Sequence, residues 1–289
     1  MKKIFLLIGL LSMVKLSLAQ EATDIFLFDL SVKKDKVVAS KPINITKHKG
    51  YDNQPSFHPA LPMIYYSSFD EAGRADIISY NYKTGKAAAI TQTPEKEYSP
   101  TVTLDQQSLS CIIQRDDGKQ DLGKYPIDGG QPFVIIDNMK VGYHVWADNS
   151  HLGLFILGTP NTLHYLLLPI KKDTIIAENI GRSLHRIPGQ AAISFVHKVS
   201  DSEWVIKRLD NKTLEVTTLI NTLPGREDLA WTPDGKIIMS DGTKLFFAQP
   251  GKGKAWTALD ISSGFEVLKN VTRVAVSADG KKLAVVVVE

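Results

Sequence analysis

The stretch "WTPDGKIIMS", residues 231–240, places an Asp-Gly pair between two short apolar runs. Asp-Gly in this setting is the strongest short-range signal of a β-hairpin, because glycine supplies the positive φ that the turn requires. A similar stretch, "VSADGKKLAV", follows at residues 276–285. The two hairpins start 45 residues apart, which indicates that the chain is built from repeated units.

Four more hairpins appear when the chain is aligned on the first inner-strand residue before each turn, here called the anchor. The six anchors are Phe57, Val102, Trp146, Ile187, Trp231 and Val276, at spacings of 45, 44, 41, 44 and 45 residues. A second strand–turn–strand segment follows each hairpin, as in "ADIISYNYKTGKAAAIT" at 75–91. Four short strands per unit of this length are typical of a propeller blade. We therefore predict an all-β fold, a six-bladed β-propeller with four strands per blade.

The last unit is incomplete, because the chain ends nine residues after Gly280. The segment from Thr23 to Thr46 has the strand–turn–strand pattern of the second half of a unit. We predict that the C-terminus supplies the inner strands of the last blade and the N-terminus supplies its outer strands. Without this closure, "LAVVVVE" at 283–289 would be an open apolar edge strand, which favours aggregation.

The first residues have the composition of a secretory signal peptide. Lys2 and Lys3 precede an apolar run over residues 4–14, and Ser17-Leu18-Ala19 offers a small-x-small cleavage site. The apolar run is short for a membrane span. We expect residues 1–19 to be removed, which leaves residues 20–289 as a single propeller domain in the bacterial periplasm or outside the cell, without a transmembrane segment. The alternative is an uncleaved N-terminal anchor.

Beyond residue 19 the chain carries 31 basic and 31 acidic residues, because the predicted signal peptide holds three lysines and no acid. This balance, without a long basic run, gives no electrostatic footprint for nucleic acid. Cys111 is the single cysteine and lies in the apolar stretch "SLSCIIQ", residues 108–114. We expect a buried thiol there, since no second cysteine is present to form an internal disulfide.

The pattern Asp-x-x-Pro-x-Phe-x-Pro in "DNQPSFHP" (52–59) has echoes in "SPTVTLD" (99–105) and "LAWTPDGK" (229–236). Together with "ADIISYN" (75–81), these stretches resemble the WD-like repeats of TolB-type six-bladed propellers. The resemblance extends over about residues 52–289. It implies the fold and is unspecific for function. TolB carries an additional N-terminal domain before its propeller, and we expect no counterpart of that domain here.

The sequence contains no Gly-x-Ser-x-Gly elbow, no His-Glu-x-x-His, no Cys-x-x-Cys and no Gly-rich phosphate loop. Asp116, Asp117 and Asp121 lack the alternating spacing of a calcium loop and fit a solvated hairpin turn. We therefore expect no cofactor. Trp146 and Trp231, both anchors, are expected to fill the space between neighbouring blades.

Polar, charged and aromatic residues stand just before the inner strand of each predicted blade. In a propeller such residues lead back to the central channel, so we expect them to gather at one mouth, where loops on a rigid frame often bind ligands. They can equally be capping residues and salt-bridge partners of their neighbours. The candidate binding residues are Tyr51, Asp52, Glu97, Tyr98, Tyr143, His144, His185, Arg186, Arg226, Glu227, Asp228 and Arg273.

His144 and His185 share one register, two residues before their anchors. Two imidazoles facing the channel could hold a metal, with Glu227 or Asp228 as a third ligand. Two hypotheses remain. The first is a non-catalytic, monomeric propeller that binds an envelope protein or a cell-wall or glycan ligand at one mouth of the channel. The second is a propeller enzyme, a metal-assisted lyase or hydrolase acting on polysaccharide. The missing nucleophile motifs favour the first.

Overall fold

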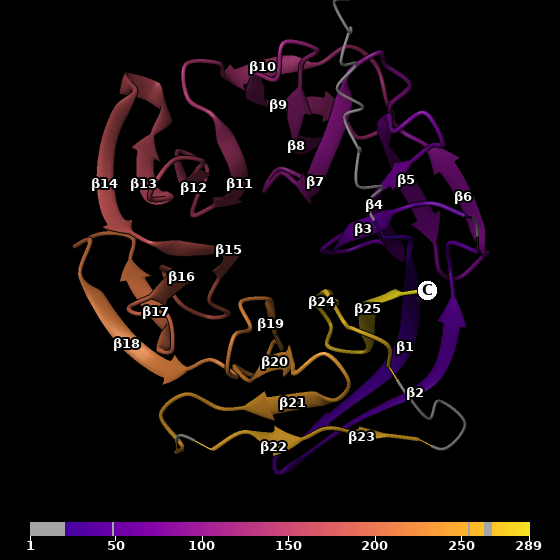
Figure 1. The fold of residues 1–289 in the computed structure, drawn as a ribbon, viewed down its shortest axis with the longest axis vertical. Coiled ribbons are helices and arrows are strands. Elements are labelled where there is room, and N and C mark those ends of the chain that lie inside the picture. Colours follow the sequence, from indigo (N-terminus) through magenta and orange to yellow (C-terminus); the bar gives the residue numbers. More distant parts are fainter. Residues whose placement is uncertain (1–20, 48, 254, 263–267) are drawn as a thin grey trace, which may run out of the picture.

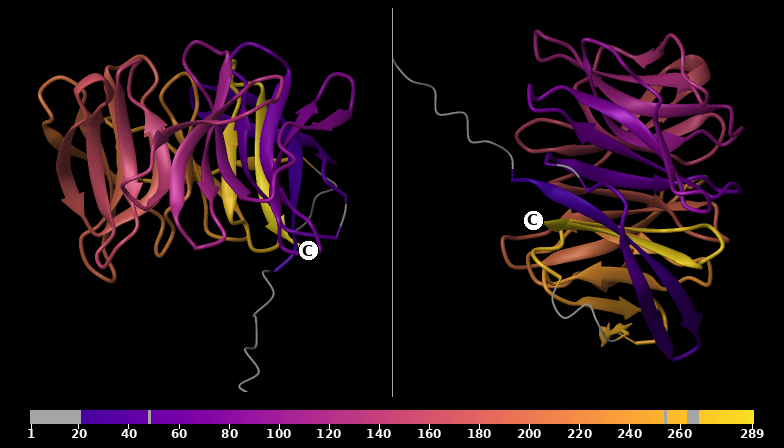
Figure 2. Two further views of the ribbon diagram at one scale, coloured as in Figure 1. Left: turned by 90° about the horizontal axis from the view of Figure 1, so that it is seen from above. Right: turned by 90° about the vertical axis from the view of Figure 1, so that its right-hand side faces the viewer.

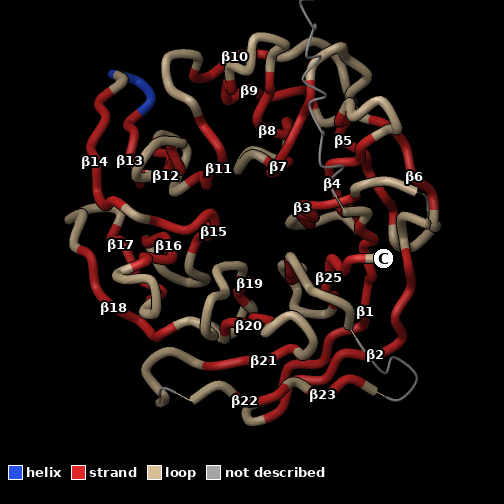
Figure 3. Tube along the Cα trace, viewed as in Figure 1, coloured by secondary structure: helices blue, strands red, loops and turns tan. Residues whose placement is uncertain are grey.

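A computed structural model of the chain describes residues 21–47, 49–253, 255–262 and 268–289; the predicted signal peptide lies outside them. The described residues form six β-sheets arranged as blades around a central axis (Figure 1). Seen from the side, the strands of neighbouring blades stand next to one another (Figure 2). The only helix in the described residues is one short 3₁₀ turn, Leu168–Ile170 (Figure 3). None of their helices has the length and apolar character to span a membrane. The predicted all-β, six-bladed propeller is confirmed.

Each blade is an antiparallel sheet whose first strand lies nearest the axis. Blade 1 contains β3 (Asp52–Phe57), β4 (Met63–Phe69), β5 (Ala75–Asn81) and β6 (Lys86–Ala89). Blade 2 contains β7 (Lys96–Val102), β8 (Ser108–Gln114), β9 (Gln120–Pro126) and β10 (Phe133–Ile136). Blade 3 contains β11 (Val141–Trp146), β12 (His151–Ile156), β13 (Thr162–Leu167) and β14 (Lys172–Glu178). Blade 4 contains β15 (Ile180–Arg186), β16 (Ala192–Lys198), β17 (Trp204–Asp210) and β18 (Val216–Asn221).

Blade 5 contains β19 (Leu229–Trp231), β20 (Ile237–Ser240), β21 (Leu245–Ala248) and β22 (Thr257–Ala258). Blade 6 contains β24 (Arg273–Val276), β25 (Lys282–Val288), β1 (Thr23–Lys33) and β2 (Lys36–Asn44), and β23 (Asp260–Ile261) adds to its outer edge in parallel with β2. Every anchor except Ile187 is the last residue of an inner strand, and Ile187 directly follows β15. The repeat read from the sequence therefore marks the ends of the inner strands.

The Asp-Gly stretches form the inner hairpins that their sequences predict. Gly235 and Gly280 have φ values of +84° and +68°, which side chains with a Cβ rarely adopt. The Thr232 N–H donates to the Lys236 carbonyl at 2.8 Å and closes the turn. The Thr232 hydroxyl also donates to the Asp234 carboxylate at 2.6 Å. The side chains of Thr232 and Asp234 therefore stabilise the turn together with the main-chain hydrogen bond.

Blade 6 joins the two ends of the chain, as predicted. β1 pairs with β25 in antiparallel register from Thr23 opposite Val288 to Asp29 opposite Lys282. Val285 packs in a cluster with blade 5, whereas Ala284 and Val286 pack in a cluster with blade 1. Both faces of β25 are therefore buried, which explains its continuous apolar run. N-terminal pairing covers the edge that the run would otherwise expose.

Hydrophobic residues lie between neighbouring blades and not in one central core. In the described part of the chain each of the six blade interfaces holds its own cluster of buried side chains. Cys111 is fully buried in the cluster between blades 1 and 2, as predicted, and burial raises the pKa of its thiol. The central channel is lined by both polar and apolar side chains.

Trp146 and Trp231 each reach sideways to the preceding blade. The Trp146 indole donates to Ser110 Oγ at 2.9 Å, and the Trp231 indole donates to Ser194 Oγ at 2.8 Å. Trp146 is 9% exposed and belongs to the core between blades 2 and 3, as predicted. Trp231 packs against the cluster between blades 4 and 5, as predicted, but it is only half-buried. Both tryptophans also line the central cavity.

Trp146→Phe and Trp231→Phe should destabilise the fold by similar amounts, about 1–3 kcal/mol each. Each substitution removes the indole N–H that donates to a fully buried serine hydroxyl on the preceding blade, Ser110 for Trp146 and Ser194 for Trp231. Water cannot easily take the place of the lost donor at either serine. Urea denaturation of the two variants measures both losses. Native-like stability of either variant would contradict the role of that indole as a donor between blades.

Candidate binding site in the central channel

A cavity of about 400 Å³ occupies the central channel and is lined by the inner strands of all six blades. In five blades its lining starts at the third residue before the anchor, and in blade 4 it starts at Arg182, five residues before Ile187. The lining continues toward the turns that follow the inner strands. These third residues form a ring: Gln54, Ser99, Tyr143, Leu184, Asp228 and Arg273. We call the cavity the cup, because side chains of this ring bridge the channel at one end.

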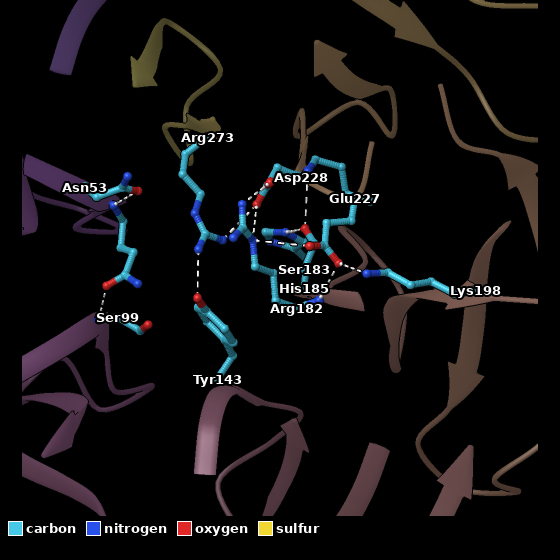
Figure 4. Close-up of polar contacts among 12 residues, drawn as sticks. Asn53, Ser99, Tyr143, Arg182, Ser183, His185, Lys198, Glu227, Asp228 and Arg273 are labelled. Carbon is cyan, nitrogen blue, oxygen red and sulfur yellow. Dashed lines mark hydrogen bonds and ion pairs between the residues drawn. The ribbon is translucent and has the colours of Figure 1, made fainter. Parts of the chain in front are cut away.

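An ionic chain forms the floor of the cup (Figure 4). Arg273, on blade 6, donates from Nη2 to the hydroxyl of Tyr143, on the opposite blade 3, at 2.9 Å. It also donates from Nη1 to Asp228 Oδ1 at 2.7 Å. Asp228, directly before β19, accepts a further hydrogen bond from Arg182 Nη2 on blade 4 at 2.7 Å. Four blades are thus linked across the channel by charged or hydrogen-bonded groups.

Glu227 extends this network away from the axis. Its carboxylate accepts from Lys198 Nζ at 3.0 Å and from the Arg182 main-chain N–H at 3.2 Å. A Cβ on residue 181 would lie 2.6 Å from Glu227 Oε2, so Gly181 provides the space for this contact. Lys198 in turn lies 4.2 Å from the centre of the Trp204 ring. Both acids that precede β19 are therefore engaged by cations.

The cup concentrates positive charge. Its charged lining residues are Arg182, Arg186, Arg273 and Asp228, a formal charge of +2. The chain beyond residue 19 is neutral overall, so this charge is local. The walls above the floor are largely apolar: Phe57, Pro59, Pro100, Val102, Pro188, Trp231 and Val276. A cationic cup with largely apolar walls suits a ligand that carries an acidic group on an otherwise less polar segment.

His144 lines the cup, but its ring is bound into the wall. Its Nε2 lies 2.7 Å from Oγ of the fully buried Ser110. The Ser110 hydroxyl donates to the Thr101 carbonyl at 3.1 Å and accepts from the Trp146 indole. When the Ser110 hydroxyl donates to Thr101, a neutral His144 donates from Nε2, and its Nδ1 is a buried atom without a partner among the described residues. Because the serine is buried and its proton is committed, this serine–histidine pair is structural and not a nucleophile with its base.

Stability should fall as the pH drops from about 6.5 to about 4. Burial lowers the pKa of His144 and that of His185 to about 4. His185 is partly exposed in the cup, so it contributes less than His144 to the loss of stability. The folded pKa lies below the unfolded one, so the unfolded chain takes up protons first and stability is retained only above that window. We expect His144 to contribute about 2–3 kcal/mol to the loss. Denaturation at several pH values should show a shallower slope for His144→Gln than for the native chain; identical slopes would contradict the assignment.

Backbone geometry shapes the other half of the ring. Gln54 and Ser99 have φ values of +58° and +53°, each directly before a proline, in the adjacent inner strands β3 and β7. The pairing register of both strands shifts at these residues, as in a β-bulge. Gln54 Oε1 accepts from the Ser99 N–H at 2.7 Å and ties blades 1 and 2 together. Left-handed non-glycine residues cluster at ligand sites, because they are kept only where the surroundings enforce them.

The structure divides the twelve sequence candidates into three groups. Those that line the cup are Tyr143, His144, His185, Arg186, Asp228 and Arg273. Arg226 and Glu227 line a smaller cavity behind the floor, together with Asp228 and Arg273. Tyr51, Asp52, Glu97 and Tyr98 line neither cavity. The expectation that all twelve gather at one mouth is corrected accordingly.

The third group has packing roles. Glu97 is fully buried, accepts hydrogen bonds from the hydroxyls of Thr93 and Tyr125 at 2.6 and 2.9 Å, and has its pKa raised by burial. The rings of Tyr51 and Tyr98 both pack against the ring of Phe69, the last residue of β4. The distances between ring centres are 5.1 Å for Tyr51 and 5.6 Å for Tyr98. Asp52 is also buried, and its carbonyl accepts from the Thr23 hydroxyl. These positions join blades 1, 2 and 6.

Arg182 is the floor residue that the sequence pattern misses. It lies five residues before the anchor Ile187, whereas Tyr143, Asp228 and Arg273 lie three residues before theirs. The register of β15 shifts between Ile180 and Leu184, and this irregularity brings Arg182 to the floor. The one available signal is the neighbouring Gly181, since an isolated glycine in a strand often marks a bulge or a close approach.

The metal site that the sequence left open is not assembled. The described ranges contain no group of three His, Cys, Asp or Glu side chains placed to hold a metal ion. His185 Nε2 lies 2.8 Å from Ser183 Oγ, and His144 Nε2 is bound to Ser110. Asp228 is paired with two arginines, as described above. The Nε2 atoms of both histidines and the carboxylate of Asp228 are therefore engaged within the protein.

Comparison with known proteins shows which solved structures share this fold. No protein-family model matches the sequence, and no curated protein matches it significantly. A protein assigned as TolB in Agrobacterium tumefaciens superposes with a TM-score of 0.67 at 13% identity, over 93% of this chain and 99% of that one. TolB from Acinetobacter baumannii gives 0.58 at 14% identity, and the match covers 93% of this chain but only 64% of that one. A gluconolactonase from Xanthomonas campestris gives 0.63 at 11% identity, over 94% and 97%.

The chain is a TolB-like six-bladed β-propeller. At such low identities the likeness concerns the fold alone, and the same architecture also occurs in a gluconolactonase. The ligand must therefore be argued from this chain's own cup.

Proposed function

We propose that this protein is a non-catalytic binding propeller of the bacterial envelope. It is exported with removal of residues 1–19, acts as a monomer in the periplasm or outside the cell, and takes a ligand into the cup. The ligand is an envelope protein or a cell-wall or glycan molecule that offers an acidic group to the floor. The proposal is supported chiefly by the positive charge of the cup, whose lining residues carry a formal charge of +2.

Two further features support binding over catalysis. The floor is preformed: Arg182, Asp228, Arg273 and Tyr143 hold one another in place across four blades, so little order has to be gained when a ligand enters. Two serine–histidine pairs lie at the cup, and the serine of each is engaged by the wall. Ser110 donates to the Thr101 carbonyl, and Ser183 Oγ accepts from the Leu229 N–H at 3.2 Å. A rigid, cationic and partly apolar cup is suited to recognition of a chain end or an acidic side group.

Arg186 offers the sharpest test, because it is exposed, lines the cup and lies outside the floor network. Arg186→Glu should lower capture of the ligand from an envelope extract by about tenfold or more, since a like charge then faces the acidic group. Lys212→Glu makes the same charge change in the exposed β17–β18 turn and serves as the matched control. Both variants should melt like the native protein. Equal capture by the two variants would overturn the proposal.

A further inference from the structure

A second cavity, of about 160 Å³, lies behind the floor of the cup. It shares Arg182, Asp228 and Arg273 with the floor. Most of its other lining residues precede the inner strands β19 and β24, whereas the cup continues to the turns that follow those strands. We call this cavity the rear pocket. It is separate from the cup, and nothing in the proposed function accounts for it.

The acids of the rear pocket are already satisfied. Asp228 Oδ1 accepts from Arg182 Nε at 3.3 Å and from Arg273 Nη1 at 2.7 Å, and Oδ2 accepts from Arg182 Nη2 at 2.7 Å. Glu227 is paired with Lys198 at 3.0 Å. No carboxylate of the pocket is left to attract a cation.

Some donors that line the rear pocket have no hydrogen-bond partner in the described part of the chain. Arg273 Nε and Thr272 Oγ1 are buried atoms without a hydrogen-bond partner within the described ranges. The guanidinium of Arg226 makes no hydrogen bond or ion pair inside that same part of the chain, and it lies against Gly242, where a Cβ would come within 2.4 Å of it. Buried donors are rarely left without an acceptor in folded proteins. The pocket therefore lacks an acceptor group.

The charge of the pocket indicates which acceptor fits. Arg182, Arg226 and Arg273 face Glu227 and Asp228, a formal charge of +1. A singly charged carboxylate neutralises this charge, whereas a phosphate near a charge of about −2 would exceed it. Guanidinium groups also match the planar carboxylate with parallel N–H donors. We propose that the rear pocket binds the carboxylate of a small ligand or of a chain end, held by Arg226, Thr272 and Arg273.

Isothermal titration of the protein tests this with four probes: N-acetylglycine, glucuronate, N-acetylglycinamide and inorganic phosphate. The two carboxylates should bind with dissociation constants on the order of 1 mM, and the neutral amide should not bind. Trp204 lines the rear pocket, so its fluorescence should respond to the carboxylates. Tighter binding of N-acetylglycine identifies peptide C-termini as the source, and tighter binding of glucuronate identifies sugar acids. Binding of the amide as tight as that of the carboxylates, tighter binding of phosphate, or no carboxylate binding would overturn the proposal.

Two variants locate the site. Arg226→Gln and Thr272→Val should each weaken carboxylate binding by about tenfold, since each removes one donor to a charged group. Lys212→Gln removes an exposed charge far along blade 4 and should leave binding unchanged. Unchanged melting curves show that the variants fold. Native-like carboxylate affinity in both pocket variants would overturn the proposal while leaving the function proposed for the cup untouched.

Discussion

A chain that begins at Pro42 is expected to give no soluble, monomeric propeller. The truncation removes β1 and most of β2, so β25 loses its pairing partner from Thr23 to Asp29. The fully buried Val285 and Val286 would then lie on an open edge strand, which invites association with other chains. Blade 6 also closes the ring between blades 5 and 1, so both neighbouring cores would be opened. Size-exclusion chromatography and thermal melting of the expressed protein measure the outcome.

A chain that begins at Glu21 is the control, because it lacks only residues outside the described structure. It should remain monomeric and melt cooperatively. A soluble monomer that starts at Pro42 and melts at the same temperature as this control would show that the shared blade does not hold the ring closed.

Asp228→Ala should destabilise the protein by about 3–5 kcal/mol. Asp228 is the single carboxylate between Arg182 and Arg273, whose side chains are 33% and 12% exposed. Removing it leaves Arg273 without a carboxylate partner and leaves Arg182 with only Glu227, whose Oε1 lies 3.6 Å from Nε. The two guanidinium groups are then close together without full access to water. Like charges then repel each other in the floor. Urea denaturation measures the loss of unfolding free energy.

Asp201→Ala serves as the control, because Asp201 is exposed and its loss should change stability by no more than about 0.5 kcal/mol. Replacing Arg182 by Met in the Asp228→Ala background should recover part of the loss, since one uncompensated charge is removed. If Asp228→Ala were as stable as Asp201→Ala, the floor would be a loose surface network and not a preformed element of the cup.

The fold could be predicted because each blade repeats one local rule. The Asp-Gly turns, the anchors and the paired apolar runs are all short-range signals, and they agree with one another around the ring. Closure followed from the valine run at residues 285–288, which needed a partner on each side. The fold of such a sequence can be predicted because its local turn residues agree with the strand pairing of the whole domain.

The site could be predicted only in part. Tyr143, Asp228 and Arg273 follow from a constant offset to the anchors, but Arg182 depends on an irregularity within β15. Glu97 carries a charge in the sequence, yet it is directed into the interior toward Tyr125. Which side of a strand faces the channel depends on bulges, and these are set by contacts between blades that no local pattern records.

Photo-crosslinking tests most directly whether the cup is the working surface. A benzophenone side chain is introduced in place of the exposed Ala278 at the rim of the cup, or in place of Ile175, which is 61% exposed on the outer strand β14. Each protein is irradiated in an envelope extract, and adducts are detected by gel shift and mass spectrometry. Binding in the cup predicts a discrete adduct from position 278 and none from position 175. A discrete adduct from position 175 alone would contradict it and would place the binding surface on the outer edge of blade 3.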